Sequence, residues 1–250
     1  MKVSIITVVY NAASTIEDTI TSVLNQSYPN IEYIIVDGQS NDGSIDIIKK
    51  YSNKISKFKS EKDAGIYDAM NKGIEMATGD VIGILNADDV YEHSEVIKNI
   101  VDKFQEKNPD AVYADLKYVM KDDLNKVIRY WKSGKYRDGK FLYGWMPPHP
   151  TFFVKKDTYN KLGLYRTDLK SASDYELMLR FIHVNKINID YLPEVIIRMR
   201  EGGMSNHSIK NRLNANKEDR KAWELNNIKP GPFTLILKPL SKLLQFIIKE

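Results

Sequence analysis

Short apolar runs alternate with helical patterns through the first third of the chain, and this alternation constrains the fold more than any other feature. Residues 3–9 form a nearly continuous β-branched run, as expected for a strand buried on both faces of a parallel sheet. Runs at 31–36, 55–59 and 81–85 follow, separated by segments whose apolar residues recur at helical spacing. Short connections between them favour parallel strand–helix–strand units with right-handed crossovers. We therefore predict an α/β fold with a mixed, mainly parallel central sheet and helices on both faces.

The second half of the chain predicts a looser mixture of elements. These are a helix at 94–106, a hairpin of strands at 111–120 and 126–131, a strand at 151–154, helices at 156–162 and from Ser173 onward, a strand at 187–197 and a charged helix at 205–225. Residues 133–150 have no helical or strand period, which predicts a long ordered loop. Such loops tend to carry substrate contacts, so Trp145 and His149 are candidates for contact with an acceptor. An aromatic cluster beneath the loop is the alternative interpretation.

Composition narrows the classes of function. Lys and Arg total 37 against 33 Asp and Glu, and a net charge of +4 is too small to indicate a nucleic-acid partner. The absence of cysteine excludes disulfides, cysteine-ligated zinc and thiol catalysis. The first residues lack the features of a signal peptide, and no apolar run reaches the ~18 residues of a membrane-spanning helix.

The last residues predict an amphipathic helical tail at 229–250, after a single domain at 1–228. If Pro239 is the first helical residue, one face is apolar, made of Leu240, Leu243, Leu244 and Ile247. Lysines at 238, 242 and 249 add positive charge. Residues 233–250 are therefore expected to contact an anionic membrane peripherally, with packing on the core or on another subunit as the alternative.

Carboxylates follow several of the predicted strands. Asp37 comes directly after the second strand, and Asp88 and Asp89 follow the strand at 81–85. In open α/β sheets ligands bind outside the carboxyl ends of the strands, and oxygen ligands there suit Mg²⁺ or Mn²⁺ with a phosphate. The alternative is that each Asp only stabilises a turn. Asp174 falls in the first turn of a predicted helix, where capping is the corresponding alternative.

Taken in order, these motifs resemble those of the inverting family-two glycosyltransferases of the GT-A fold. The matching stretches are 7–11 (TVVYN), 36–38 (VDG), 42–44 (DGS), 63–73 (DAGIYDAMNKG), 78–80 (TGD), 86–89 (NADD) and 173–177 (SDYEL). They extend over about residues 2–210 and leave the tail outside. This chain has Asn86 where the family motif has its first aspartate, Ser173 where it has a glutamate, and Met70 where many relatives have an arginine.

The resemblance implies a role for each matching residue. The residues implied to bind the nucleotide-sugar donor are Thr7, Tyr10, Asn11, Asp37, Asp63, Asn71, Lys72, Asn86 and Ala87. Asp88 resembles the ligand of a divalent metal, Mn²⁺ or Mg²⁺, with His207 completing the site, and Asp174 resembles the catalytic base. Arg180 matches an arginine near the acceptor and joins Trp145 and His149 as acceptor-binding candidates. Residues 1–110 would then form the nucleotide-binding half and 111–228 the acceptor-binding half.

The implied activity is metal-dependent, inverting transfer of a sugar from a nucleotide sugar, expected to be a UDP-sugar. The acceptor would be a hydroxyl of a glycan or lipid-linked molecule in surface polysaccharide synthesis, in the cytoplasm at the inner face of the cell membrane. A sugar-phosphate nucleotidylyltransferase is one alternative, although residues 7–13 lack the Gly-rich loop with a basic residue that such an enzyme needs. A non-catalytic module that binds a nucleotide sugar or a membrane surface is the other, and it would have no use for Asp174.

Overall fold

The alternation of strands and helices predicted for the first third of the chain is present in the structure, a computed structural model that describes residues 1–202, 209–231, 233–235, 237 and 238. The elements are β1 (Val3–Val9), α1 (Ile16–Leu24), β2 (Ile31–Asp37), α2 (Ser44–Lys50), β3 (Lys57–Ser60), α3 (Ile66–Met76) and β4 (Val81–Ile84). Strands β1, β2, β3 and β4 are parallel, with β1 between β2 and β4. Their carboxyl ends therefore meet at one edge of the sheet.

The remaining elements extend this sheet. They are β5 (Val90–Tyr91), α4 (Val96–Lys107), β6 (Ala111–Met120), β7 (Asp123–Trp131), two 3-10 turns (Lys140–Tyr143 and His149–Thr151), β8 (Phe153–Lys155), α5 (Lys156–Leu162), α6 (Ser173–Met178), a π-helical turn (Leu179–Val184), β9 (Ile189–Arg200) and α7 (Ile209–Leu225). In the described part of the chain the strand order is β3-β2-β1-β4-β8-β6-β9-β5, with β7 paired to β6. Because β8 is antiparallel to both β4 and β6, strands β6 and β9 run in the direction of β4. The predicted mixed, mainly parallel sheet is confirmed.

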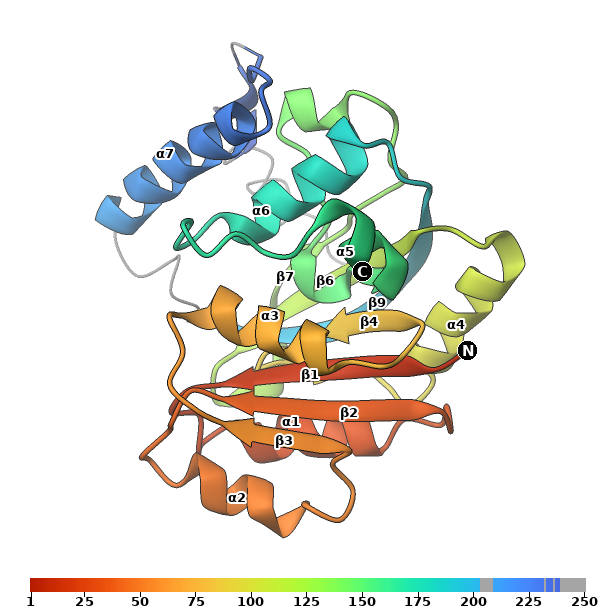
Figure 1. Ribbon diagram of the computed structural model, residues 1–250, viewed down its shortest axis with the longest axis vertical. Helices are drawn as coiled ribbons and strands as arrows, with labels where there is room; N and C mark the ends of the chain where they lie inside the picture. The colour runs from red at the N-terminus through yellow and green to blue at the C-terminus, as the bar shows by residue number, and fades with distance from the viewer. Residues whose placement is uncertain (203–208, 232, 236, 239–250) are drawn as a thin grey trace.

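Helices cover both faces of the sheet (Figure 1). Within β1, Ile6 and Val8 pack on the face that carries α3, α5 and α6, whereas Val3 and Ile5 pack on the opposite face with α1, α2 and α4. This alternation is the period-two pattern of a strand, and because both faces are covered, every residue of β1 is buried. Burial on both faces holds the strand ends in place, which is what a site at the sheet edge requires.

Two predictions about local structure are wrong. Strand β5 is missing from the predicted elements because it has two residues, and only its pairing with β9 defines it. The expected side-chain capping of α6 is also absent: Ala172 is the N-cap residue and makes no such bond, and the buried Ser173 hydroxyl has no hydrogen-bond partner among the described residues. The predicted loop at 133–150 contains the two 3-10 turns, and the second turn begins at His149.

The described part of the tail packs against the body of the protein. The Lys238 ammonium pairs with the Asp219 carboxylate at 2.6 Å and lies 3.5 Å from the centroid of the Tyr175 ring. A Cβ atom on Gly144 would overlap the backbone of Lys238, so these segments are in close contact. Only 12% of the Lys238 side chain is exposed, which for this residue favours the alternative of packing on the core. The predicted apolar face, residues 240–247, lies outside the described residues, and none of the described helices is long and apolar enough to cross a membrane.

Candidate active site

The carboxyl ends of β1 and β2 place an exposed aromatic ring beside a carboxylate. Tyr10 follows β1 and is 69% exposed. A Cβ atom added to Gly38 would lie 2.5 Å from Asp63 Oδ2 and 3.4 Å from a carbon of the Tyr10 ring, so Gly38 is the residue that lets these two side chains converge. Asp63 Oδ1 accepts a hydrogen bond from the Gly65 amide at 2.9 Å, which fixes the carboxylate. An open ring next to a fixed carboxylate can stack on a base and accept hydrogen bonds from a nucleoside.

Two neighbouring residues organise the loops around this pair. Asn11 has a left-handed backbone (φ 49°), and its side-chain oxygen accepts the Asn41 amide at 3.0 Å. Asp37 is fully buried and accepts the Ser40 amide and, at 2.6 Å, the Ser60 hydroxyl. The structure therefore supports the turn-stabilising interpretation of Asp37, since its carboxylate has no surface to offer a donor.

Three predicted donor-binding residues have side chains that are engaged elsewhere. Thr7 is fully buried, and its hydroxyl accepts a hydrogen bond from the Tyr33 hydroxyl at 3.2 Å. The Asn71 amide is bound on both its oxygen and its nitrogen by the backbone of another loop, at residue 165. The Lys72 ammonium pairs with two carboxylates at 3.1 Å, those of residues 61 and 68. In this structure the side chains of Thr7 and Asn71 are engaged within the protein, and Lys72 belongs to an ion-pair network.

The turn after β4 carries the candidate metal ligands. The Ala87 carbonyl accepts the Thr15 hydroxyl at 2.8 Å, which holds the turn against α1. Asp88 is partly exposed, whereas Asp89 is fully buried, and the Asn86 side-chain nitrogen donates to Asp89 Oδ2 at 3.3 Å. Asp88 and not Asp89 is therefore the carboxylate of this turn that a ligand can reach.

Burial shapes the electrostatics of this turn. It raises the pKa of Asp88 and, together with the neighbouring Asp88 charge, raises the pKa of Asp89 well above its usual range. The side-chain oxygens Asn86 Oδ1 and Asp89 Oδ1 are buried and have no hydrogen-bond partner among the described residues. Asn86 is partly exposed like Asp88, and an unpaired amide oxygen beside a reachable carboxylate is a donor set that Mg²⁺ or Mn²⁺ accepts, so Asn86 and Asp88 fit a divalent cation. The described residues contain no cluster of three His, Asp or Glu side chains for a metal, and the predicted ligand His207 lies outside them.

Arg200, the last residue of β9, ties this turn to two other segments. Its guanidinium donates to the carbonyl oxygens of Asp88 at 2.7 Å and Lys121 at 3.1 Å, and it pairs with the Asp18 carboxylate at 2.5 Å. A pocket of about 390 Å³ opens beside it, lined by Ser14, Thr15, Asp18, Lys121, Asp122, Asp123, Leu124 and Arg200. The sequence alone predicts no role for Arg200, although its position at a strand end is a signal of the same kind as that of Asp88.

Asp174, in the first turn of α6, faces the same edge and is held on both of its oxygens. Its Oδ1 accepts the Tyr67 hydroxyl at 3.3 Å and the Tyr175 amide at 2.8 Å, and its Oδ2 lies 3.3 Å from Nδ1 of His149. Burial lowers the pKa of His149, and the charges of Asp174 and Asp88 act against this shift. His149 is therefore in contact with the carboxylate of the base candidate and within the electrostatic influence of the metal candidate.

The other two acceptor candidates are structural in the described conformation. The Trp145 indole N–H donates to the Ser133 carbonyl at 2.8 Å, and its ring packs on the Tyr136 and Phe141 rings, which favours the aromatic cluster over the sugar platform. The Arg180 guanidinium pairs with Glu176 at 2.9 Å and donates to the carbonyl oxygens of residues 162, 163 and 164. The donors of Arg180 hold the loop after α5 in this structure.

Comparison with known proteins agrees with this architecture. The model of glycosyl transferase family 2 matches residues 4–162, and the chain belongs to this family. An uncharacterized glycosyltransferase of Rickettsia typhi is 31% identical over 207 residues, which are 79% of this chain and 63% of that protein. An uncharacterized glycosyltransferase of Mycobacterium tuberculosis is 32% identical over 180 residues, which are 71% of this chain and 68% of that protein.

Solved structures show the same fold. S. aureus TarS in complex with UDP-GlcNAc superposes with a TM-score of 0.70 at 19% identity, over 90% of this chain and 65% of that chain. The mannosyltransferase PcManGT from Pyrobaculum calidifontis, in complex with GDP-Man and Mn²⁺, gives 0.67 at 20% identity, over 97% of this chain and 69% of that chain. The predicted GT-A fold and the predicted family are both confirmed.

Proposed function

We propose that the protein is a metal-dependent, inverting glycosyltransferase that moves a sugar from a nucleotide sugar to a hydroxyl group of an acceptor. The observation that carries this proposal is the contact of Asp174 with His149 at 3.3 Å, at the edge of the sheet where the turn after β4 leaves the Asp88 carboxylate within reach of a ligand. One carboxylate is suited to the leaving diphosphate with its metal, and the other to the acceptor. Family membership supports the same assignment.

The donor would bind at the ends of β1 and β2. The exposed ring of Tyr10 offers a stacking surface, and the fixed carboxylate of Asp63 offers hydrogen-bond acceptors to the base or ribose. The TarS structure contains UDP-GlcNAc and the PcManGT structure contains GDP-Man, so proteins of this fold bind both kinds of nucleotide sugar. We propose a UDP-sugar as the donor, as the resemblance of the sequence motifs implies, and the panel of nucleotide sugars below includes GDP-mannose as the competitor.

Asp88 and the side-chain oxygen of Asn86 would hold the divalent cation, with His207 as the further predicted ligand. Asn86 contributes an oxygen without a charge. When bound, the cation supplies Lewis-acid stabilisation to the negative charge that develops on the leaving diphosphate. PcManGT contains Mn²⁺ in its complex with GDP-Man, which supports this choice of cofactor.

Asp174 would act as the general base. The acceptor oxygen forms a bond to the anomeric carbon while the bond from that carbon to the diphosphate oxygen breaks, and the electron pair leaves with the diphosphate. The acceptor proton passes to the Asp174 carboxylate, and direct displacement inverts the configuration at the anomeric carbon. General-base catalysis of this kind contributes roughly 10²- to 10⁴-fold in rate. His149 keeps Asp174 Oδ2 facing the site.

The proposed acceptor is a glycan or a lipid-linked sugar used in surface polysaccharide synthesis at the cytoplasmic face of the membrane. The apolar face and lysines predicted for residues 239–250 support peripheral contact with an anionic lipid surface. Because Lys238 is paired with Asp219, the contact would depend on residues beyond it.

The test compares Asp174→Asn with a matched control, Asp157→Asn. Asp157 is also an aspartate in the first helical turn, in α5, but it is exposed and away from the site. With a panel of nucleotide sugars and Mn²⁺, D174N should bind nucleotide normally while sugar transfer falls by at least ~100-fold, and D157N should resemble wild type.

Two outcomes would favour the alternatives. Release of pyrophosphate from a nucleoside triphosphate and a sugar phosphate would indicate a nucleotidylyltransferase. Nucleotide-sugar binding without any transfer to the acceptors tested, by wild type and D174N alike, would indicate a binding module.

A further inference from the structure

We infer that Tyr67 is a positioning residue for Asp174, and that Asn71 acts through Tyr165 to hold Tyr67 in place. This inference rests on the proposed role of Asp174 as the base. It also reassigns Asn71, which the sequence resemblance places in the donor site.

The hydroxyl of Tyr67 reaches Asp174 from a different helix. Tyr67 lies in the first turn of α3, with 9% of its surface exposed, and Asp174 lies in the first turn of α6. The distance from the hydroxyl to Asp174 Oδ1 is 3.3 Å. Burial, followed by the Asp174 charge, raises the pKa of Tyr67, so the phenol keeps its proton and donates to the carboxylate. With Oδ1 held by Tyr67 and Oδ2 facing His149, the plane of the carboxylate is fixed.

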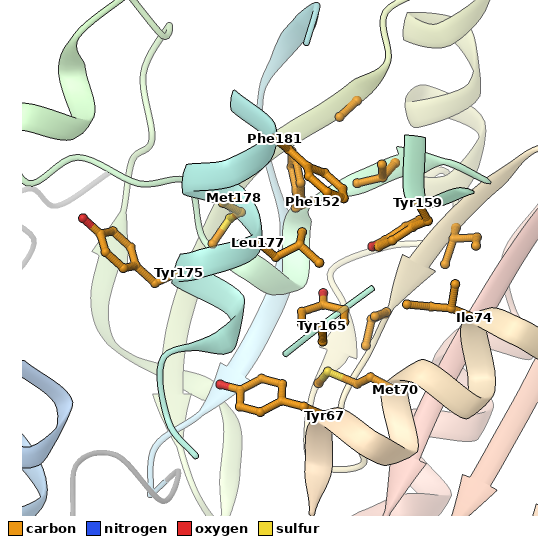
Figure 2. Close-up of a cluster of buried hydrophobic side chains, with 14 of the residues drawn as sticks. Tyr67, Met70, Ile74, Phe152, Tyr159, Tyr165, Tyr175, Leu177, Met178 and Phe181 are labelled. Carbon is orange, nitrogen blue, oxygen red and sulfur yellow. The ribbon is translucent and has the colours of Figure 1, made fainter. Parts of the chain in front are cut away.

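Tyr165 holds the Tyr67 ring from above. The two rings are stacked, with centroids 5.7 Å apart and planes inclined by 16° (Figure 2). Tyr165 lies on the loop between α5 and α6, which has no secondary structure at that point. A stacked ring on an irregular loop can orient its neighbour only if the loop itself is anchored.

Asn71 supplies the anchor. Its side-chain oxygen accepts the Tyr165 amide at 2.9 Å, and its side-chain nitrogen donates to the Tyr165 carbonyl at 2.8 Å. Asn71 is one turn after Tyr67 on α3, so both side chains project from the same face of the helix. Helix α3 therefore carries both Tyr67 and Asn71, the residue that anchors the Tyr165 ring stacked on Tyr67.

Packing alone does not account for the Tyr67 hydroxyl. Burying a hydroxyl costs free energy unless it is hydrogen-bonded, and the partners of this hydroxyl belong to the first turn of α6: the Asp174 carboxylate and the backbone N–H groups of Ser173 and Asp174. A phenylalanine would keep the stack on Tyr165 without that cost. Directing the Asp174 carboxylate is the use of this hydroxyl that the surrounding contacts indicate.

The experiment measures kcat, donor dissociation constant and thermal midpoint for Tyr67→Phe, Asn71→Ala and their combination. The control is Tyr191→Phe, because Tyr191 is equally buried, stacks on Tyr113 and donates its hydroxyl to a different carboxylate, that of Asp115. We expect Y67F to lower kcat about tenfold, since a misdirected base loses part of its general-base contribution. Donor affinity should stay within about twofold of wild type, and Y67F should lower the thermal midpoint no more than Y191F does.

A double-mutant cycle separates positioning from general packing. If Asn71 acts through Tyr67, N71A lowers kcat in the wild-type protein but has little further effect in Y67F. Additive losses, a wild-type kcat in Y67F, or a parallel loss of donor affinity would each overturn the inference. These results differ from failure of the proposed function, in which D174N itself would keep its activity.

Discussion

Replacing Gly38 by alanine tests the donor site with a single methyl group. A Cβ atom at this position lies 2.5 Å from Asp63 Oδ2, so the carboxylate must move by about 0.9 Å to reach an ordinary contact distance of 3.4 Å. The atom in the way is the end of a side chain, and Gly38 has an ordinary backbone conformation. The protein should therefore fold normally while Asp63 turns away from its position beside Tyr10.

The expected loss follows from the bond that Asp63 would make to a nucleoside. A hydrogen bond to a charged group is worth about 1.5–3 kcal/mol. That range corresponds to roughly 10- to 100-fold in the dissociation constant for the nucleotide. Calorimetry with UDP and with GDP measures this directly, and a thermal scan checks that G38A is folded.

Asp63→Ala provides the control for G38A. With the carboxylate gone, the added methyl group has little to displace, so G38A/D63A should bind nucleotide no more weakly than D63A alone. The explanation that Gly38 leaves space for the Asp63 carboxylate would be refuted by either of two results: additive losses of nucleotide affinity in G38A/D63A, or wild-type nucleotide affinity in G38A.

Three further predictions address stability, the metal and the tail. Burial alone would raise the pKa of Glu32, but hydrogen bonds from Ser4, Thr78 and Lys2 hold this pKa well below its usual range. The ionised carboxylate therefore stabilises the folded protein above about pH 4.3, and this contribution to the free energy of unfolding is lost as the pH falls. Glu32→Gln should thus lower the urea midpoint more at pH 7 than at pH 3, and the difference should widen below pH 3; an equal loss at all pH values would contradict this. Asp88→Asn should abolish transfer and remove the effect of Mn²⁺ on nucleotide affinity; Mn²⁺-dependent transfer that persists in this variant would contradict the assignment of Asp88. Deleting residues 239–250 should abolish binding to anionic vesicles at low salt and leave the free energy of unfolding unchanged. Deleting 233–250 removes Lys238 as well, so it should also lower the free energy of unfolding by about 3–5 kcal/mol, because the buried Asp219 loses its partner. Equal stability of the two truncated proteins would contradict the pairing of Lys238 with Asp219.

The parallel half of the fold is predictable because burial on both faces leaves a strong sequence pattern. The run at 3–9 gives β1 its observed bounds, and the run at 31–36 misses only the last residue of β2. Strand β3 begins two residues later than its weak apolar pattern indicates, and its residues are largely exposed at the sheet edge. Strand β5 has no pattern to detect, because its two residues become a strand only by pairing with β9.

The site is predictable in position but not in the state of each side chain. Parallel strands end at one edge, so the convergence of Asp63 and Asp88 follows from their places after strands. Whether Asn71 is open to a donor depends on Tyr165, which is 94 residues away in the sequence. Arg180 likewise depends on backbone carbonyls of the loop after α5, and carbonyl groups leave no trace in a residue pattern.

The acidic residues at the carboxyl edge of the sheet fall into two groups that differ in burial and in role. Asp37 and Asp89 are fully buried, and they brace the turns after β2 and β4. Asp63, Asp88 and Asp174 keep part of their surface exposed, and each is held in place: Asp63 by the Gly65 amide, Asp88 through its carbonyl by Arg200, and Asp174 by the Tyr67 hydroxyl. Burying the first group costs desolvation free energy, and the hydrogen bonds that these carboxylates make to the loops offset this cost. The second group can then meet a ligand with little reorganisation, which is the condition for electrostatic stabilisation of a developing charge.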